Sequence, residues 1–516
     1  MPQRPQRREI LDETGRPRTL DSGPEAFDRL GGDGPPLFLG LGPEPERLAE
    51  WFPEAAAGAD FLESPETEAA LGPEFVAAIP PNFRRLAPED VAPERLRRDR
   101  VFWFRQGMRL HPGFWGPLWA RLGLALGGAG PQQATAWLPG DEQALVLPEL
   151  SRAFGSLGFP ARLIPDDPGL VPELLRRERP ALYFSVNFRG LDPFGETFHL
   201  LRQAGVRVAV WCVDNPFHLL TRIKSRFWTQ ALILVTDHWF VEPLKRLGAE
   251  QVLHLPLAAD PGFSGDGPLP AQARGLEDRL VFVGRSVFPD RDGFFAGARS
   301  APENLALAGT LLAQGTRPHF GWWLKRLGID RPWPGNVVRA AGLGADQSGL
   351  AWRTLCLRAA GPALTVIGDP GWQELLPGAD LRPPVDYYGG LAAVYRHAAC
   401  SLNITGMLLP SGLTQRHFDV WTAGGFLLTD ANPGLEIFPE ELVRAVAFAR
   451  AEELPALFSR LAGDSPEKRA LARQWRETIL AGHTYAHRAA KVLAAAGLDR
   501  TLVSAHKGLE VRPENG

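Results

Sequence analysis

The chain has 516 residues, too many for one hydrophobic core, so several domains are expected. Hydrophobic residues make up 45% and charged residues 22%, as in a soluble globular protein. The formal net charge is −3, which gives no global basic field and argues against a nucleic-acid partner. Cys212, Cys356 and Cys400 lie far apart, which excludes a disulfide framework and gives no zinc-ligand spacing.

The first residues, MPQRPQRREILDETGRPR, are polar and charged and lack the apolar core of a signal peptide. No stretch approaches the ~20 apolar residues that a membrane-crossing helix needs. We therefore expect a cytoplasmic protein without a transmembrane segment. His483 and His487 are four residues apart but have no third ligand nearby, so no metal site is predicted.

Residues 1–130 are predicted to form an N-terminal accessory α/β region, a candidate surface for an acceptor protein or another subunit. A short apolar strand at 36–42 runs into a Gly turn, and 60–63 is a second strand with an acidic end. The turn lacks the full dinucleotide fingerprint, so a packing turn is favoured. The aromatic and basic segment 105–119 can stack on bases or sugars, but a domain seam filled by Trp and Phe is the favoured interpretation. A Gly/Pro-rich stretch places the boundary near residue 130.

Residues 131–265 are predicted to form a doubly wound α/β domain. Short apolar runs alternate with helical stretches, the pattern of parallel βαβ units; the runs are 135–138, 181–186, 206–213, 232–235 and 252–255. Ligands bind beyond the carboxyl ends of such strands. The loops there carry Asn187 after one strand, and Asp214, Asn215 and His218 after the next. Asp214 is a candidate general base, and a turn-capping Asp is the structural alternative.

A second doubly wound domain is predicted for 278–480, with a helical insertion at 288–360, followed by a C-terminal helix and tail at 481–516. Its first strand, starting at Leu280, ends in Gly284-Arg285-Ser286. That loop can hold a diphosphate through Arg285 and backbone N–H groups.

The stretch LNITGMLLPSGLTQRHFDVWTAGGFLLTD, residues 402–430, is predicted as strand, loop, helix and strand. Ser411 or Thr414 is expected to cap the helix, whose N-terminus would present free N–H groups to an anion. Arg416 in its first turns suits a phosphate, because its guanidinium offers a fork of donors. Asp419 shares a face with Arg416, and a ribose would supply hydroxyls for its carboxylate to accept.

Several of these segments resemble the CgeB-type glycosyltransferases. The resemblance rests on Arg416-His-Phe-Asp419 with Thr422 to Asp430, and on Glu453-Leu454. It also includes the tail Gly482-His-Thr-Tyr485 with Arg488. In the N-terminal half, Val210-Trp-Cys-Val-Asp214-Asn-Pro216 and Leu255-Pro-Leu-Ala-Ala-Asp260-Pro are similar to the corresponding segments of the family. The resemblance covers about residues 180–490 and leaves 1–130 outside it.

This resemblance implies the GT-B arrangement, in which two Rossmann-like domains face a cleft and usually need no bound metal. It implies that the donor, a nucleotide sugar, is a substrate and that there is no further cofactor. Asp419 would meet the ribose, where related transferases often carry the longer Glu. The diphosphate would be met by the remaining donor residues of the family pattern: Gly284, Arg285, Ser286, Gly412, Thr414 and Arg416.

The resulting hypothesis is a metal-independent glycosyltransferase that moves a sugar from a nucleotide donor to a protein or glycan acceptor. Asp214 would serve as the base if the transfer inverts, and Asn187, Asn215 and His218 would line the acceptor side. A non-catalytic nucleotide-sugar or glycan-binding protein on the same fold is the alternative. A nicotinamide-dependent oxidoreductase built on Leu39–Gly42 is a third, weaker hypothesis.

Overall fold

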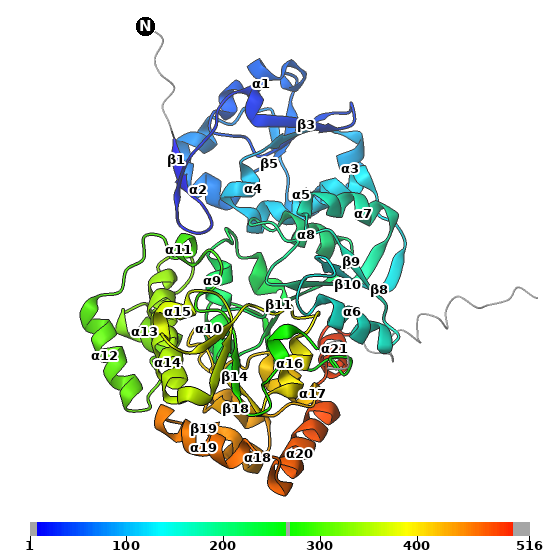
Figure 1. Cartoon of the computed structure of the whole chain (residues 1–516). Helices are drawn as coiled ribbons and strands as arrows, with labels where there is room; N and C mark the ends of the chain where they lie inside the picture. Colours follow the sequence, from blue (N-terminus) through cyan, green and yellow to red (C-terminus); the bar gives the residue numbers. More distant parts are fainter. Residues whose placement is uncertain (1–7, 265–268, 499–516) are drawn as a thin grey trace, which may run out of the picture.

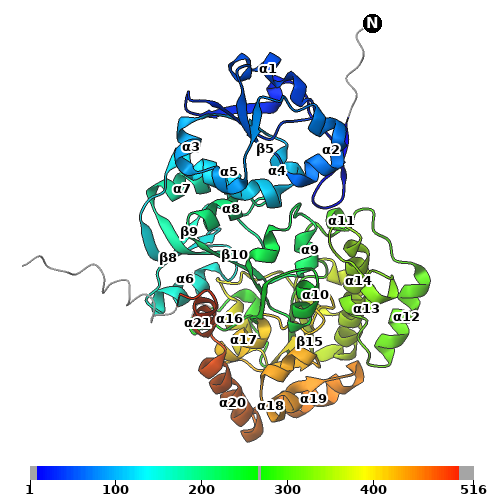
Figure 2. The same cartoon turned by 180° about the vertical axis from the view of Figure 1, so that it is seen from behind.

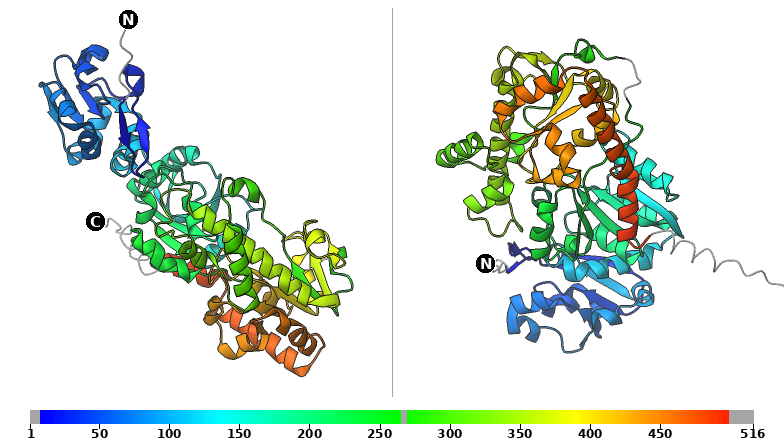
Figure 3. Two further views of the ribbon diagram at one scale, coloured as in Figure 1. Left: turned by 90° about the vertical axis from the view of Figure 1, so that its left-hand side faces the viewer. Right: turned by 90° about the horizontal axis from the view of Figure 1, so that it is seen from below.

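The computed structural model describes residues 8–264 and 269–498, which form three α/β domains, each built on its own sheet, arranged along the molecule (Figure 1). Figure 3 shows the N-terminal domain at one end and the C-terminal domain at the other, with the middle domain between them. The predicted fold class is confirmed, because two doubly wound parallel sheets follow a smaller N-terminal α/β domain.

The N-terminal sheet has the strand order β6-β5-β4-β7-β3, in which β3 is antiparallel to β7 and the other pairs are parallel. Its strands are β3 (Phe27–Gly31), β4 (Pro36–Leu39), β5 (Ala59–Leu62), β6 (Phe83–Arg85) and β7 (Arg100–Phe104). A separate hairpin of β1 (Glu9–Leu11) and β2 (Pro17–Thr19) precedes the sheet. The helices include α2 (Pro65–Ala77), α3 (Pro93–Arg98), α4 (Gly107–Leu110) and α5 (Pro112–Gly127).

The Gly turn after β4 is filled by protein side chains. Gly40 has φ 87°, and a Cβ there would lie 2.7 Å from the Cβ of Phe104. Leu41 is fully buried, and its amide donates to the Glu63 carboxylate at 2.7 Å. The turn therefore packs the N-terminal core, in agreement with the favoured packing interpretation.

The middle sheet is wholly parallel and has the order β13-β12-β11-β10-β8-β9. Its strands are β8 (Gln132–Pro139), β9 (Ala161–Ile164), β10 (Arg179–Val186), β11 (Arg207–Cys212), β12 (Leu232–Val235) and β13 (Gln251–His254). Seven of the eight residues of β10 are buried, as expected for a central strand covered by helices on both faces. Those helices include α6 (Leu147–Ser156), α7 (Val171–Arg177), α8 (Glu196–Gln203), α9 (Pro216–Leu220) and α10 (Val241–Arg246).

The C-terminal sheet is also parallel, with the order β16-β15-β14-β17-β18-β19. Its strands are β14 (Leu280–Val283), β15 (Leu364–Ile367), β16 (Asp380–Arg382), β17 (Cys400–Asn403), β18 (Leu427–Asp430) and β19 (Ala447–Phe448). Counted along the chain this is the 3-2-1-4-5-6 order of dinucleotide-binding folds, and it reverses between β14 and β17. A ligand is expected at that reversal, beyond the carboxyl ends of the two strands.

Helices cover both faces of the C-terminal sheet. The four between β14 and β15 occupy the region predicted as a helical insertion: α11 (Arg291–Phe294), α12 (Pro302–Ala313), α13 (Phe320–Arg326) and α14 (Val338–Ala359). The others include α15 (Trp372–Leu375), α16 (Leu391–His397), α17 (Arg416–Thr422), α18 (Glu440–Val446), α19 (Leu454–Leu461) and α20 (Pro466–Gly482).

The last helix, α21 (Tyr485–Ala495), returns to the middle domain and lies beside α6 (Figure 2). Tyr485, Ala489 and Val492 are buried in the same hydrophobic cluster as Trp211 of β11. The chain therefore passes between the middle and C-terminal domains twice, once in each direction.

Helix α5 forms the seam between the N-terminal and middle domains. It contacts α3 on one side and α8 on the other, and Trp115 and Leu118 on it are buried. Trp115 packs against Trp103 in the N-terminal core, whereas α5 meets α8 at small residues, so the predicted seam filled by Trp and Phe is not confirmed. Gly116 allows the close approach, because a Cβ there would lie 2.2 Å from Cδ2 of the buried His199 on α8.

Gly116→Ala should destabilise this seam by about 1–3 kcal/mol, because the added methyl group has no space beside His199. Gly123→Ala on the same helix is the matched control, since its Cβ would meet Leu200 at an ordinary 3.6 Å. That control should be neutral or stabilising, by about 0.5–1 kcal/mol, because Ala favours a helix. Urea unfolding of both variants measures the difference, and equal stability would contradict the packing argument.

Candidate functional site

The carboxyl edges of the middle and C-terminal sheets face each other across two hydrogen-bonded loops. Asn215, after β11, donates from Nδ2 to the backbone oxygen of Leu408 at 2.9 Å. Asp237, after β12, accepts from the backbone amide of Ser411 at 2.8 Å and is fully buried. The loop between β17 and α17 is thus held against the middle domain.

Arg416 lies at the strand-order reversal of the C-terminal sheet. Its Nη1 donates to Oδ1 of Asn403 at 3.2 Å, and its Nε donates to the backbone oxygen of Val283 at 3.4 Å. The guanidinium also lies over the ring of Phe282, 5.5 Å from its centroid. A Cβ at Gly284 would be 3.4 Å from Nη2 of Arg416. The predicted phosphate-binding side chain is therefore next to the predicted phosphate-binding loop.

A second arginine, Arg353 of α14, reaches the same place. Its Nη1 donates to the backbone oxygen of Arg285 at 2.8 Å. Burial and then the positive charge of Arg416 lower the pKa of Arg353. Two guanidinium groups held near each other in a partly desolvated place form a site suited to an anion. No local signal in the sequence points to Arg353, because it is an ordinary residue in the middle of a long helix.

The predicted loop Gly284-Arg285-Ser286 follows β14 as expected, but its three residues differ in what they offer. The Arg285 side chain is exposed. Ser286 donates from its amide (2.7 Å) and its hydroxyl (2.6 Å) to the carboxylate of Asp369, at the end of β15. Burial alone would raise the pKa of Asp369, but these hydrogen bonds from Ser286 hold it below its usual value. In this structure Ser286 supports the loop through Asp369.

The prediction that Ser411 or Thr414 caps the helix after the loop is wrong. Helix α17 begins at Arg416, and neither Ser411 nor Thr414 accepts a capping hydrogen bond. The Thr414 amide instead donates to Nδ1 of His417 at 3.0 Å, and its hydroxyl donates to Asn403 at 2.8 Å. Gly412 is buried, and its backbone oxygen accepts from Asn432. The roles of Gly412 and Thr414 toward a diphosphate stay predictions.

Asp419 is almost completely buried, with 1% of its surface exposed. One carboxylate oxygen accepts from the Tyr387 hydroxyl at 2.8 Å, and the other accepts from Nε2 of Gln415 at 2.8 Å. Burial raises the pKa of Asp419 to about 7, against the opposing effect of these two hydrogen bonds. A ribose hydroxyl would have to replace Tyr387 on this carboxylate. The sequence analysis missed both Tyr387 and Gln415.

A pocket of about 180 Å³ opens between the two domains beside Tyr387. The middle domain contributes Glu149 and Arg152, and the C-terminal domain contributes Tyr387, Tyr388 and Gly390. The Tyr388 hydroxyl donates to Glu149 across the pocket at 3.3 Å, and burial raises the pKa of Glu149. This pocket lies between the two domains and is partly closed by a Tyr–Glu contact, and none of the predicted donor or acceptor residues lines it.

Asn187 and Asp214 come together at the carboxyl edge of the middle sheet. Nδ2 of Asn187 donates to Asp214 at 2.7 Å, while its Oδ1 accepts from the Val213 amide at 2.9 Å. Asp214 keeps part of its surface exposed, yet burial of its carboxyl group raises its pKa against the Asn187 hydrogen bond. A carboxyl group with this environment can take up a proton nearer to neutral pH than an ordinary Asp. Its role as a base stays a prediction.

Asn215 and His218 have structural partners here. Asn215 caps α9 by accepting from the amides of Phe217 and His218, so the capping role considered for Asp214 belongs to its neighbour. His218 is buried against the rings of Phe294, Phe295 and Phe320, and burial and then Arg339 lower its pKa to about 3. A neutral, enclosed imidazole gives no support to an acceptor-side role, which remains an untested prediction.

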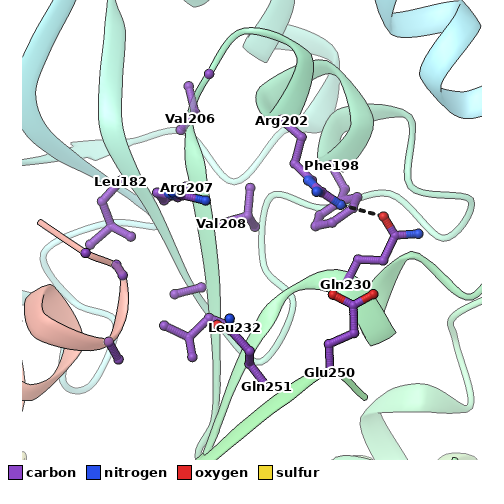
Figure 4. Close-up of a pocket in the computed structure, with 15 residues that line it drawn as sticks. Leu182, Phe198, Arg202, Val206, Arg207, Val208, Gln230, Leu232, Glu250 and Gln251 are labelled. Carbon is purple, nitrogen blue, oxygen red and sulfur yellow. Dashed lines mark hydrogen bonds between the residues drawn. The ribbon is translucent and has the colours of Figure 1, made fainter. Parts of the chain in front are cut away.

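The pocket in Figure 4, of about 620 Å³, lies at the other edge of the middle sheet. It is lined by the amino ends of β11, β12 and β13, including Arg207, Leu232 and Gln251, and Arg202 donates to Gln230 beside it. Ligands of parallel sheets bind at the carboxyl ends, so this pocket is separate from the candidate site. Within residues 8–264 and 269–498, no group of three or more metal-ligating side chains is arranged around one point, and no helix has the length and apolarity to span a membrane.

Residues 351–494 match the family model described as glycosyl transferase-like. This match confirms the predicted glycosyltransferase-like domain in the C-terminal part of the chain. The narrower resemblance to CgeB-type enzymes stays a prediction. None of the curated proteins matches the chain.

Solved structures with similar folds include trehalose-6-phosphate from E. coli bound with UDP-2-fluoro glucose, at 12% identity and TM-score 0.39, covering 70% of this chain and 98% of that one. Anabaena Alr3699/HepE with UDP and glucose has 10% identity and TM-score 0.40, with 70% and 99% covered. A mutant of T4 phage BGT in complex with UDP-glucose has 9% identity and TM-score 0.37, with 70% and 99% covered. Because these identities and TM-scores are low, we base the fold assignment on the strand orders of this chain and not on these structures.

Asp419 should make stability pH-dependent. Because its pKa rises from an ordinary 3.8 to about 7 on folding, the folded chain holds this proton more tightly than the unfolded chain. The resulting stabilisation is complete below pH ~4 and is lost as the pH rises to about 7, on the order of 4 kcal/mol in total.

Asp419→Asn should flatten this fall in the free energy of unfolding between pH 4 and 7, measured by denaturant titration at several pH values. Asp292→Asn, at an almost fully exposed carboxylate, is the control and should keep the wild-type slope. An unchanged slope in Asp419→Asn would show that this carboxyl group titrates normally.

Proposed function

We propose that the protein transfers a sugar from a nucleotide-activated donor to a protein or glycan acceptor, with no bound metal. The observation that carries this proposal is the pair Arg353 and Arg416 at the strand-order reversal of a sheet within a glycosyltransferase-like domain. The pair lies beside the Gly284–Arg285 turn, where a diphosphate would also meet backbone groups.

The chemistry of sugar transfer explains why such a pair is useful. As the bond from the sugar to the diphosphate breaks, positive charge develops on the sugar ring and negative charge on the departing phosphate. Fixed guanidinium groups in a water-poor site stabilise that negative charge without reorganising. Arg353 and Arg416 supply two positive charges there, and Arg285 adds a third that is exposed and free to reach a ligand.

The acceptor hydroxyl would be activated by the middle domain, from the carboxyl edge of its sheet. Asp214 belongs to the middle sheet, whose carboxyl end faces the C-terminal domain through Asn215 and Asp237. With its pKa raised by burial, Asp214 is suited to accept the proton of an attacking hydroxyl in an inverting transfer. Asp419 would bind the ribose after Tyr387 has moved away.

A cytoplasmic location is part of the proposal, since Cys212, Cys356 and Cys400 are all buried free thiols, the state that a reducing compartment preserves. The N-terminal domain is the proposed contact for an acceptor protein or a second subunit. It is joined to the middle domain by α5 and also by Glu13, which accepts from the amides of Gly113 and Arg226 at 2.7 Å each.

One observation favours the alternative of a non-catalytic binding protein. The Asp419 carboxylate is covered by Tyr387 and the loop before α17 is packed against the middle domain, so the site as it stands is closed. Incubating the chain with nucleotide sugars and measuring release of nucleoside diphosphate separates the two. A binding protein would show affinity without release.

Arg353→Ala and Arg416→Ala should each weaken nucleoside diphosphate binding by about 10- to 100-fold, because each removes charge-assisted hydrogen bonds to the phosphates. Both variants should keep the wild-type fold, which circular dichroism checks. Arg358→Ala on the same helix is the control, since Arg358 binds the backbone oxygen of Leu375 and not the site. Isothermal titration calorimetry with UDP, GDP and ADP gives the affinities, and wild-type affinity in both site variants would rule out the assignment.

Asp214→Asn should lower kcat for sugar transfer by about 100-fold or more, because the amide cannot accept the acceptor's proton. Donor affinity should stay within about 2-fold of the wild type, since Asp214 lies on the middle domain. Steady-state kinetics at saturating donor measure kcat. A variant that keeps its full kcat would indicate a different base or a retaining mechanism.

A further inference from the structure

The two passages of the chain between the middle and C-terminal domains are hydrogen-bonded to each other. The Ala259 amide donates to the backbone oxygen of His483 at 2.8 Å, and the Tyr485 amide donates to that of Ala259 at 3.0 Å. Ala259 and Thr484 form a parallel bridge. Residues 256–260 and 482–485 thus make one double crossing, and any change in the angle between the domains has to be absorbed there.

Arg488 of α21 fixes one side of the double crossing. Only 2% of its surface is exposed, and it donates to the backbone oxygens of Pro256 at 2.8 Å and Leu257 at 3.1 Å. The middle-domain side of the crossing is therefore rigidly attached to α21. Movement between the domains is left to the contacts that the crossing makes with the C-terminal domain.

One side chain of the C-terminal domain binds both passages. Nε2 of Gln415 donates to the backbone oxygen of Ala258 at 2.7 Å, and its Oε1 accepts from the Tyr485 hydroxyl at 3.0 Å. The same Nε2 donates its other hydrogen to Asp419 at 2.8 Å. A single amide therefore connects the double crossing directly to the carboxylate that would bind the ribose.

The remaining oxygen of Asp419 holds the Tyr387 hydroxyl, a donor of the same kind as a ribose hydroxyl. Tyr387 also packs on Phe263, just beyond the first passage, with ring centroids 5.1 Å apart. Replacing Tyr387 by a ribose would thus release one contact near the crossing and change the partners of Asp419, to which Gln415 is bound.

We propose that Gln415 is a positioning residue that couples nucleotide binding at Asp419 to the angle between the two domains at the double crossing. This inference rests on the proposed nucleotide-binding function. It assigns Gln415 and Tyr485 a role in setting the angle between the domains when the donor binds, while Arg353 and Arg416 bind the phosphates.

The test uses the full chain with UDP, GDP and ADP as probes. Calorimetry gives affinity, and small-angle X-ray scattering gives the change in radius of gyration on adding the nucleotide that binds. The wild type should bind, and its radius of gyration should change. Tyr485→Phe removes only the crossing-side hydrogen bond, so affinity should stay within about 3-fold. The change in radius of gyration should be lost, and kcat should fall about tenfold with little change in KM.

Gln415→Leu removes all three hydrogen bonds, so affinity should fall by about tenfold and the change in radius of gyration should be lost. Gln272→Leu is the control, since Gln272 donates to the backbone oxygen of Pro384 away from the crossing. If Gln415→Leu fails to fold, Tyr485→Phe still decides. A wild-type change in radius of gyration in Tyr485→Phe, or nucleotide binding by the wild type without any such change, overturns the coupling alone. Absence of binding by the wild type to any of the three nucleotides overturns the proposed function as well.

Discussion

The candidate site depends on keeping two arginine side chains, Arg353 and Arg416, close together in a partly buried position. Like charges at short range repel, and burial adds to the cost of each. Asp346, Asp369 and Asp430 lie near enough to offset part of that cost for Arg353. These carboxylates are themselves engaged: Arg291 pairs with Asp346, Ser286 binds Asp369, and Arg317 pairs with Asp430. The positive charge of the arginine pair is therefore only partly compensated, which is the condition for binding an anionic ligand.

The rest of the structure maintains that arrangement. Arg353 depends on the long helix α14, and Arg416 depends on the loop before α17, which is held down from the other domain by the buried Asp237. Asp430 holds the start of the same loop in place. Its carboxylate accepts hydrogen bonds from the amide and hydroxyl of Thr405 and from the indole N–H of Trp352. The sheet order thus brings strand ends together, and buried carboxylates fix the loops between them.

The sequence was sufficient for the central strands and for the edge strand β13, but it missed the edge strands β9 and β16. Strands such as β10, β12 and β18 are short apolar runs because helices cover both of their faces. Edge strands β9 and β16 are partly exposed and carry charged residues, so they resemble loops in the sequence. The residues that complete the site were hidden for another reason. Arg353 and Gln415 act through contacts with segments far away in the chain, which no local pattern reports.

Asp237 could have been found from the sequence, since an Asp two residues after an apolar strand is the kind of residue that the strand-end rule singles out. The same rule identified Asp214 and Asn187, and the structure brings those two together. It did not distinguish ligand-facing residues from structural ones: Asn215 caps a helix, and His218 fills an aromatic cluster. Residue type and position at a strand end therefore indicate where a site lies. Which of these side chains can bind a ligand depends on their burial and on their hydrogen-bond partners in the folded protein.

The return of α21 to the middle domain has a consequence for biosynthesis. The apolar face that includes Trp211 and Phe184 is covered in part by Tyr485, Ala489 and Val492, which are translated more than two hundred residues later. A nascent chain that has emerged only as far as β13 therefore exposes an apolar surface that its own residues do not cover. The middle domain completes its core only after the entire C-terminal domain has left the ribosome, so the two domains mature together, and the N-terminal domain can fold ahead of both.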